Sequence, residues 1–118
     1  MKNVLVTGAA RGLGLAIAQR LVTEGYKVIG IGRTLTDDYQ QLITQSDNDQ
    51  VSFHCYDMND LEGIPALVTG ITRDSGPLYG LINNAAIGLD GVLATMHASE
   101  IGRVLRVNLE APILMSKF

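Results

Sequence analysis

Apolar and polar residues alternate along the chain in blocks whose period changes between that of a strand and that of a helix. Four short apolar runs have the length and composition of buried parallel strands, at residues 2–7, 27–32, 51–56 and 79–83. Four longer segments carry apolar residues at helical spacing, at 12–24, 36–46, about 61–73 and about 97–117. The pattern therefore predicts strands and helices in alternation, without repeats or low-complexity linkers.

Local signals indicate where two of these helices begin. Thr36 is followed by Asp37 and Asp38, which is typical of a capping hydroxyl with acidic residues in the first helical turn. Pro65 is tolerated in a first turn but not later, so we expect the regular part of the third helix to begin at about this residue.

The alternation also predicts the arrangement of the strands. Strand–helix–strand units give a parallel sheet with helices on both faces. Right-handed crossovers then place the strands in the order 3-2-1-4, with a reversal between strands 1 and 4. Ligands of such sheets bind in the crevice at the reversal, beyond the carboxyl ends of the strands. The loops after strands 1 and 4 are therefore predicted to face a binding site.

The loop after the first strand is rich in glycine. Residues 7–14 read Thr-Gly-Ala-Ala-Arg-Gly-Leu-Gly and lead directly into the first helix. A plain turn would need one glycine, whereas Gly8, Gly12 and Gly14 together let a pyrophosphate approach the backbone. The free N–H groups and the positive dipole end of the helix attract such an anion. These residues therefore predict a dinucleotide site.

Charge and composition restrict the partners and the compartment. The net charge is -3 and the six arginines and three lysines are scattered, so nucleic acid is not an expected partner. No run approaches the ~18 apolar residues of a membrane span, and we expect a soluble, cytoplasmic protein. Cys55 is alone, which excludes a disulfide within the chain, and we expect it to be a small buried hydrophobe. His54 and His97 have no partners at metal-ligand spacing, so no metal site is predicted.

Four short motifs together resemble the first half of the short-chain dehydrogenase/reductase family. They are TGAARGLG at 7–14, CYDM at 55–58, NNAA at 83–86 and RVNL at 106–109. Their order and spacing match the family, and the resemblance covers essentially the whole chain. It implies a Rossmann-like three-layer α/β/α half-domain, with residues 1–118 forming a single dinucleotide-binding domain that is truncated relative to the family.

The resemblance assigns roles to the glycine-rich segment. Gly8, Gly12 and Gly14 would form the tight turn against the pyrophosphate. Leu13 would contribute its backbone N–H while its side chain packs inward. Thr7 is expected to be structural, its hydroxyl tying the turn to a neighbouring segment.

The residues after strand 2 favour NADP over NAD. Gly32 stands where an NAD-type member would carry an acid, so no carboxylate repels a 2′-phosphate. Arg33 follows it, and Arg11 resembles the second basic marker of NADP-binding members. Two guanidinium groups can hold one phosphate by charge-assisted contacts, and Thr34 could add a hydroxyl. Either arginine alone could equally be a solvated surface side chain.

The remaining motifs imply an adenine site and a proton relay. Asp57 would accept from the adenine amine and Met58 would offer its backbone N–H, although a helix cap formed by Asp57, Asn59 or Asp60 is the alternative. The turn beside the cofactor ribose would contain Asn84, Ala85 and Ala86, and the family usually has glycine at the position of Ala86. Asn108 resembles the asparagine of the catalytic network, with an exposed helix position as the alternative.

The catalytic groups of the family are not matched in this chain. The family transfers a hydride between a nicotinamide and an alcohol or carbonyl carbon, using a serine, a tyrosine and a lysine four residues after the tyrosine. The tyrosines lie at 26, 39, 56 and 79, and the lysines at 2, 27 and 117, so no pair has that spacing. The catalytic half is expected to be absent, and the chain to be inactive alone.

Three hypotheses remain open at this point. The chain is the NAD(P)-binding part of an oxidoreductase whose gene continues beyond Phe118, or a non-catalytic nucleotide-binding half-domain, or an excised structural fragment. In each case strand 4 would be an apolar sheet edge, and exposed apolar edges recruit other chains. The last helix would also lack a neighbour for its apolar residues Ile101, Val104, Leu105, Leu109 and Ile113. We therefore expect a homo-oligomer formed through strand 4 and this helix.

Overall fold

The computed structural model describes residues 2–47, 49–85, 99, 102 and 106–117. Its elements are β1 (Asn3–Thr7), α1 (Gly12–Thr23), β2 (Lys27–Gly32), α2 (Asp37–Gln45), β3 (Val51–Cys55), α3 (Ile64–Ser75), β4 (Leu78–Ile82), η2 (Arg106–Glu110) and α5 (Ala111–Lys117). The segment η2 is a π-helical turn. The predicted alternation is confirmed through β4, and each strand begins and ends within one residue of its predicted bounds.

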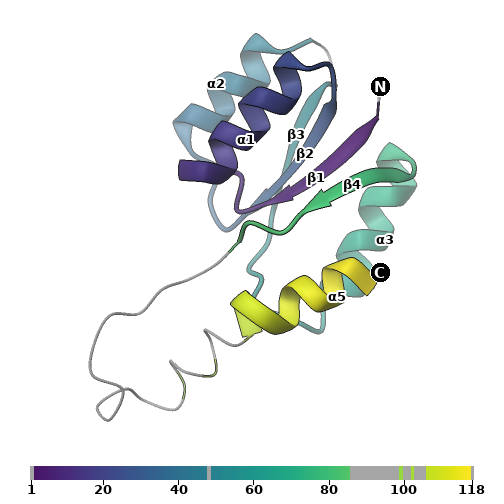
Figure 1. Ribbon diagram of the computed structural model, residues 1–118. Helices are drawn as coiled ribbons and strands as arrows, with labels where there is room; N and C mark the ends of the chain where they lie inside the picture. The colour runs from purple at the N-terminus through teal and green to yellow at the C-terminus, as the bar shows by residue number, and fades with distance from the viewer. Residues whose placement is uncertain (1, 48, 86–98, 100–101, 103–105, 118) are drawn as a thin grey trace.

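The four strands form one parallel sheet in the order β3-β2-β1-β4, as predicted (Figure 1). In the register of the sheet, Leu5 of β1 lies between Ile29 of β2 and Leu81 of β4. The chain builds outward from β1 to β3 and then returns to the other side of β1. The reversal therefore lies between β1 and β4, and the loops after these strands open at the same edge of the sheet.

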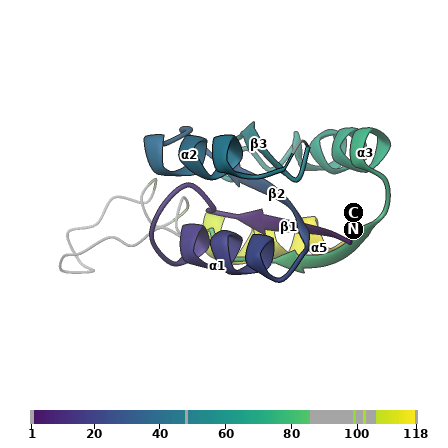
Figure 2. The same cartoon turned by 90° about the horizontal axis from the view of Figure 1, so that it is seen from above.

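Helices cover both faces of the sheet (Figure 1). Side chains alternate along each strand, so consecutive residues belong to opposite faces. The face covered by α1 and α2 buries Val4, Val6, Ala9, Ala18, Val28, Tyr39 and Val51. The face covered by α3 and α5 buries Leu5, Ile29, Ile31, Met58, Ile64, Val68, Ile71, Val107, Ala111 and Met115. Seen from above, α2 lies beside β3 and α1 beside β1 (Figure 2). The fold is the expected Rossmann-like α/β/α arrangement.

The start of α2 confirms the capping prediction. The Thr36 hydroxyl accepts a hydrogen bond of 3.2 Å from the backbone N–H of Tyr39, and Asp37 and Asp38 occupy the first turn. The Tyr39 side chain is fully buried, and its hydroxyl donates to the Ser52 carbonyl oxygen at 2.8 Å. Burial raises the pKa of the Tyr39 hydroxyl well above its usual value, because the charged form would lose its water. Helix α3 likewise begins as expected, with Pro65 in its first turn.

The last helix differs from the prediction. One regular helix was expected over about 97–117, but the described residues 106–110 form a π-helical turn and α5 begins at Ala111. Pro112 explains the break, because a proline has no N–H to donate and is tolerated only in a first turn. The structure places it in the first turn of α5. Residues 97–98, 100–101 and 103–105 of the predicted helix lie outside the described residues.

The expected burial of Cys55 is wrong. Its side chain is exposed and its thiol is free. Cys55 is the last residue of β3, and β3 is an outer strand of the sheet. At this position Cys55 has a neighbouring strand on one side only, and the residue paired with it there is Gly32, which has no side chain to cover the thiol.

Candidate functional site

Two loops meet at the carboxyl ends of β1 and β4, and hydrogen bonds join them. The Thr7 hydroxyl accepts from the backbone N–H groups of Asn84 and Ala85, at 3.0 and 2.9 Å, and donates to the Ile82 carbonyl oxygen at 3.4 Å. The Asn84 side-chain amide donates to the Gly8 carbonyl oxygen at 3.2 Å. The structural role predicted for Thr7 is confirmed, since this buried hydroxyl holds the β4 loop against β1.

The glycine-rich loop needs glycine at position 14 for space and at position 12 for its backbone conformation. A Cβ at Gly14 would lie 1.9 Å from the Gly8 carbonyl oxygen and 2.6 Å from the Asn84 amide nitrogen. Gly12 has a φ of 58°, a backbone conformation that L side chains rarely adopt, and beyond its chain neighbours and its own helix backbone no described atom lies within 4 Å of the position of its missing Cβ. The loop therefore packs tightly on its inner side and leaves open space on its outer side.

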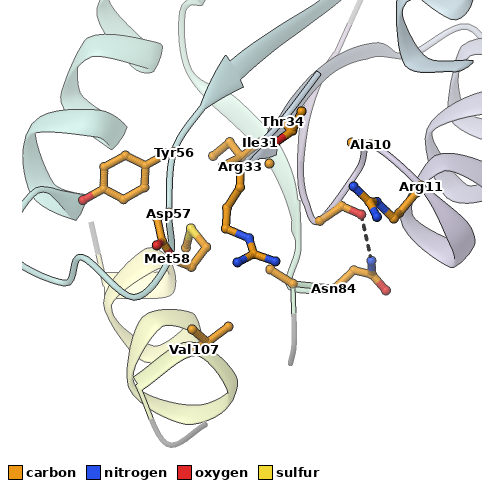
Figure 3. Close-up of a pocket in the computed structure, with 13 residues that line it drawn as sticks. Ala10, Arg11, Ile31, Arg33, Thr34, Tyr56, Asp57, Met58, Asn84 and Val107 are labelled. Atoms are coloured by element: carbon orange, nitrogen blue, oxygen red, sulfur yellow. Dashed lines mark hydrogen bonds between the residues drawn. The ribbon is translucent and has the colours of Figure 1, made fainter. Parts of the chain in front are cut away.

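A pocket of about 440 Å³ lies beyond the ends of the strands, at the predicted reversal. Its walls come from the glycine-rich loop, the loops after β2, β3 and β4, and η2 (Figure 3). The predicted residues that line it are Gly8, Arg11, Arg33, Thr34, Asp57, Met58, Asn84 and Ala85. Gly32, predicted as the position that lacks an acid, also lines it, and the lining residues not predicted from the sequence are Ala10, Ile31, Tyr56 and Val107. Thus one cavity brings together segments that are far apart in the sequence.

The two arginines carry the positive charge of the pocket. Arg33 extends into it from the end of β2, and Arg11 lies beside the bond between Asn84 and Gly8 (Figure 3). In the part of the chain that the structure describes, the ion pairs are Arg20 with Glu24 and Arg73 with Asp74, so neither pocket arginine is paired with a carboxylate. Both guanidinium groups are exposed to solvent and available to an anion.

The loop after β3 forms the opposite wall. Asp57 accepts a hydrogen bond of 2.9 Å from the backbone N–H of Asn59 in a local turn. The alternative of a helix cap is wrong, because the N-cap of α3 is Gly63 and no side chain caps it. One carboxylate oxygen makes that bond, and a carboxylate can accept several more. Met58 is buried against η2, where Arg106 Nε donates to the side-chain oxygen of Asn59 at 2.6 Å. The loop after β3 is therefore held both by its own turn and by η2.

Tyr56 is an unpredicted member of this wall. Its hydroxyl donates to the Asp60 carbonyl oxygen at 2.5 Å, across the turn that leads to α3. Burial raises the pKa of the Tyr56 hydroxyl, and the nearby Asp60 carboxylate raises it further. Tyr56 therefore stays neutral at physiological pH and serves as part of the wall.

Comparison with known proteins identifies the family. The model of the short chain dehydrogenase family matches residues 2–118. The chain belongs to this family. Among curated relatives, it is 34% identical over 116 residues to the 3-oxoacyl-[acyl-carrier-protein] reductase FabG of Vibrio cholerae, covering 98% of this chain and 47% of the relative. The chain thus spans about half the length of the curated relatives it matches.

Solved structures of short-chain dehydrogenases match the fold closely. A short-chain dehydrogenase from Streptomyces avermitilis gives a TM-score of 0.90 at 28% identity, over 98% of this chain and 42% of the other. A metagenomic short-chain oxidoreductase in complex with NADP gives a TM-score of 0.86 at 30% identity, over 98% of this chain and 53% of the other. The resemblance inferred from the four sequence motifs is therefore confirmed at the level of family and fold.

Some predicted site residues of this short-chain dehydrogenase chain lie away from the pocket lining. The expectation that the Leu13 side chain packs inward is wrong, because it is 69% exposed. The buried face of α1 is formed by Gly14 and Ala18, and Leu13 projects beside it. Its backbone N–H remains one of the unpaired donors of the first helical turn. Gly12 and Gly14 shape the loop without lining the pocket, and Ala86 lies outside the described residues.

Asn108 occupies the π-helical turn and its side chain is exposed. It is not part of the pocket lining, whereas the preceding residue, Val107, is. Its role in a catalytic network therefore stays a prediction. Val107 could have been found from the sequence, since it belongs to the same RVNL motif and is apolar at a helix position facing the sheet.

The described residues were also compared with the requirements of a metal site and of a membrane-spanning helix. No group of three or more His, Cys, Asp or Glu side chains is arranged to hold a metal ion in the described ranges. Among the helices of the same residues, none is long and apolar enough to cross a membrane.

Proposed function

We propose that the chain is the NADP-binding part of a short-chain dehydrogenase-type oxidoreductase, with residues 1–118 forming one dinucleotide-binding domain. The observation that carries the proposal is the pocket at the sheet reversal, which contains two unpaired guanidinium groups and has Gly32 in place of an acid. The reductase FabG and the structure with bound NADP, which are similar to this chain over 47% and 53% of their own lengths, support the same class of activity.

The residues of the pocket fit a dinucleotide phosphate. The open outer side of the Gly12 loop would take the pyrophosphate against the first N–H groups of α1. Arg11 and Arg33 would hold the 2′-phosphate, with the Thr34 hydroxyl beside them. Asp57 and Met58 would bind the adenine, and Asn84 with Ala85 and Ala86 would flank the ribose. When bound, the cofactor would supply or accept the hydride.

The chemistry of the whole protein is also part of the proposal. It would transfer a hydride between NADP and an alcohol or carbonyl substrate, with Asn108 contributing to the proton relay. The 118 residues contain no tyrosine with a lysine four positions later, so we propose that they bind the cofactor without turnover. A cytoplasmic location fits such an enzyme, and cofactor binding without catalysis would equally suit a nucleotide-binding half-domain.

Parallel calorimetric titrations with NADP and NAD test the cofactor assignment. We expect NADP to bind more tightly, and Arg33→Asp to weaken NADP by on the order of 1.5–3 kcal/mol, roughly 10- to 150-fold, as for other hydrogen bonds to charged groups. Arg73→Asp makes the same charge change on the exposed surface of α3 and serves as the control. Equal affinity for the two cofactors, or an unchanged affinity in Arg33→Asp, would contradict the assignment of the 2′-phosphate site.

We further propose that the chain associates with itself through β4 and the last helix. β4 is the outer strand on its side of the sheet, and Leu109 and Ile113 are 55% and 58% exposed on η2 and α5. The other apolar residues of the predicted contact, Ile101, Val104 and Leu105, lie outside the described residues. An edge strand flanked by exposed apolar side chains favours pairing with another chain.

A further inference from the structure

The segment that carries Arg33 is attached to the glycine-rich loop at both of its ends. At the first end, the Ile31 carbonyl oxygen accepts from the backbone N–H groups of Gly8 and Ala9, at 2.8 and 3.2 Å. At the second end, the Thr36 hydroxyl donates to the Ala10 carbonyl oxygen at 2.5 Å. The loop between these two attachments is only a few residues long and has Arg33 near its start.

The Thr36 hydroxyl makes two different hydrogen bonds. It accepts from the Tyr39 N–H, which caps α2, and it donates to Ala10, which precedes Arg11. A hydroxyl has one donor and two acceptor sites, so both bonds can form together. The donor bond is not needed for capping. It joins the start of α2 to the loop that carries the second arginine of the pocket.

Between the two attachments, Gly32 is still held by the sheet, since its carbonyl oxygen accepts from the backbone N–H of Tyr56 at 2.9 Å, but the next three residues are not. Arg33, Thr34 and Leu35 form none of the hydrogen bonds found among the described residues, and all three side chains are exposed. The glycine-rich loop, in contrast, has a further attachment through the Asn84 side chain, which donates to the Gly8 carbonyl oxygen. Loss of the bond from Thr36 to Ala10 would therefore loosen the Arg33 segment more than the glycine-rich loop.

We propose that Thr36 is a positioning residue that sets the preference for NADP over NAD. It holds the Arg33 segment at a fixed place relative to Arg11, so that both guanidinium groups can reach one phosphate. The inference rests on the proposed function, because only a 2′-phosphate needs the two arginines together. The pyrophosphate and adenosine, which NADP and NAD share, are bound by the separately attached glycine-rich loop and the β3 wall.

Two variants test the Thr36 hydroxyl, and the ratio of the NADP and NAD dissociation constants separates its positioning role from capping. Thr36→Val removes the hydroxyl while keeping the shape of the side chain, and Thr36→Ser keeps both hydrogen bonds. Thr44→Val is the matched control, because the Thr44 hydroxyl lies on the same helix and donates only to the Gln40 carbonyl oxygen within α2. The dissociation constants for NADP and NAD are measured for each, together with the Tm.

In Thr36→Val we expect the dissociation constant for NADP to rise about fivefold, the effect of one ordinary hydrogen bond, and that for NAD to change less than about twofold. Thr36→Ser and Thr44→Val should keep the wild-type ratio of the dissociation constants for NAD and NADP. If Thr36→Val weakens both cofactors equally, or neither, Thr36 only caps the helix and the proposal is wrong.

A second measurement keeps the two proposals distinguishable. If wild type shows no preference for NADP, the proposed function fails, and the positioning role is then judged on the ligand-free protein. NMR order parameters of the backbone N–H groups of Arg33, Thr34 and Leu35 should be lower in Thr36→Val than in Thr44→Val, with little change at Gly12 and Gly14. Unchanged order parameters in the Arg33 segment would refute the positioning role on its own.

Discussion

Replacing Gly14 by alanine asks whether close contact between the two loops is the reason for the third glycine of the motif. A Cβ at this position would lie 1.9 Å from the Gly8 carbonyl oxygen, where ordinary contact begins at 3.4 Å, so a backbone segment must move by about 1.5 Å. The movement would also separate the Asn84 amide from Gly8, which it now contacts at 3.2 Å. The cost therefore includes both overpacking and a lost hydrogen bond.

These contributions can be compared in free energy. Overpacking of a dense site costs about 1–3 kcal/mol, and the hydrogen bond contributes about 1 kcal/mol. Alanine gains about 1 kcal/mol over glycine from helix propensity, because position 14 is inside α1. We expect Gly14→Ala to lower the free energy of unfolding by about 2–3 kcal/mol, since the contacted atom belongs to the backbone and cannot turn aside.

Urea unfolding followed by far-ultraviolet circular dichroism measures this difference. Gly70→Ala is the control, because Gly70 lies inside α3 and a Cβ there would meet only the Arg73 guanidinium, at 3.9 Å. That substitution should raise the free energy of unfolding by about 0.5–1 kcal/mol through helix propensity alone. If Gly14→Ala were as stable as wild type, the packing argument for the glycine-rich loop would be refuted.

Three further results are expected. The free energy of unfolding should fall as the pH rises above about 10, because the unfolded chain releases the Tyr39 proton near pH 10 while the raised pKa keeps it bound in the folded protein. Urea midpoints at pH 8 and pH 11 should show a smaller fall in Tyr39→Phe, and an equal fall would mean that Tyr39 does not contribute. Light scattering at micromolar concentration should give a mass above the 12.7 kDa of one chain, and a strictly monomeric mass would exclude self-association through β4. The affinity for NADP should decrease as salt is added, since the phosphate contacts are ionic, and a salt-independent affinity would contradict them.

The sequence predicted those parts of the molecule that depend on periodicity and chain connection. The strand order followed from alternation and handedness, and the Thr36 cap followed from one hydroxyl before two acids. The exposure of individual side chains could be predicted less well from the sequence. Leu13 is apolar but lies beside the buried face of α1, and Cys55 belongs to an apolar run but ends an outer strand. In both cases the exposure depends on tertiary neighbours that a local pattern does not contain.

The pocket also contains both residues that the sequence predicted and residues that it did not. The motif residues that line it were predictable because each follows the end of a strand. Tyr56 and Val107 were not predicted because they line the pocket without a recognisable binding group. Ala10 was not predicted because its carbonyl oxygen, and not its side chain, makes the hydrogen bond. Pro112 was a signal present in the sequence, since a proline cannot stand in the middle of a regular helix, and it marks the change from η2 to α5.

The hydrogen bonds at the sheet end also bear on how such a protein can change during evolution. Arg33, Thr34 and Leu35 are exposed and do not contribute hydrogen bonds to the described sheet or helices, so their exchange costs the fold little. The glycine-rich loop, fixed by steric contact with its neighbours, has no such freedom. Substitutions in this short stretch can therefore change the cofactor preference while the rest of the binding site stays the same.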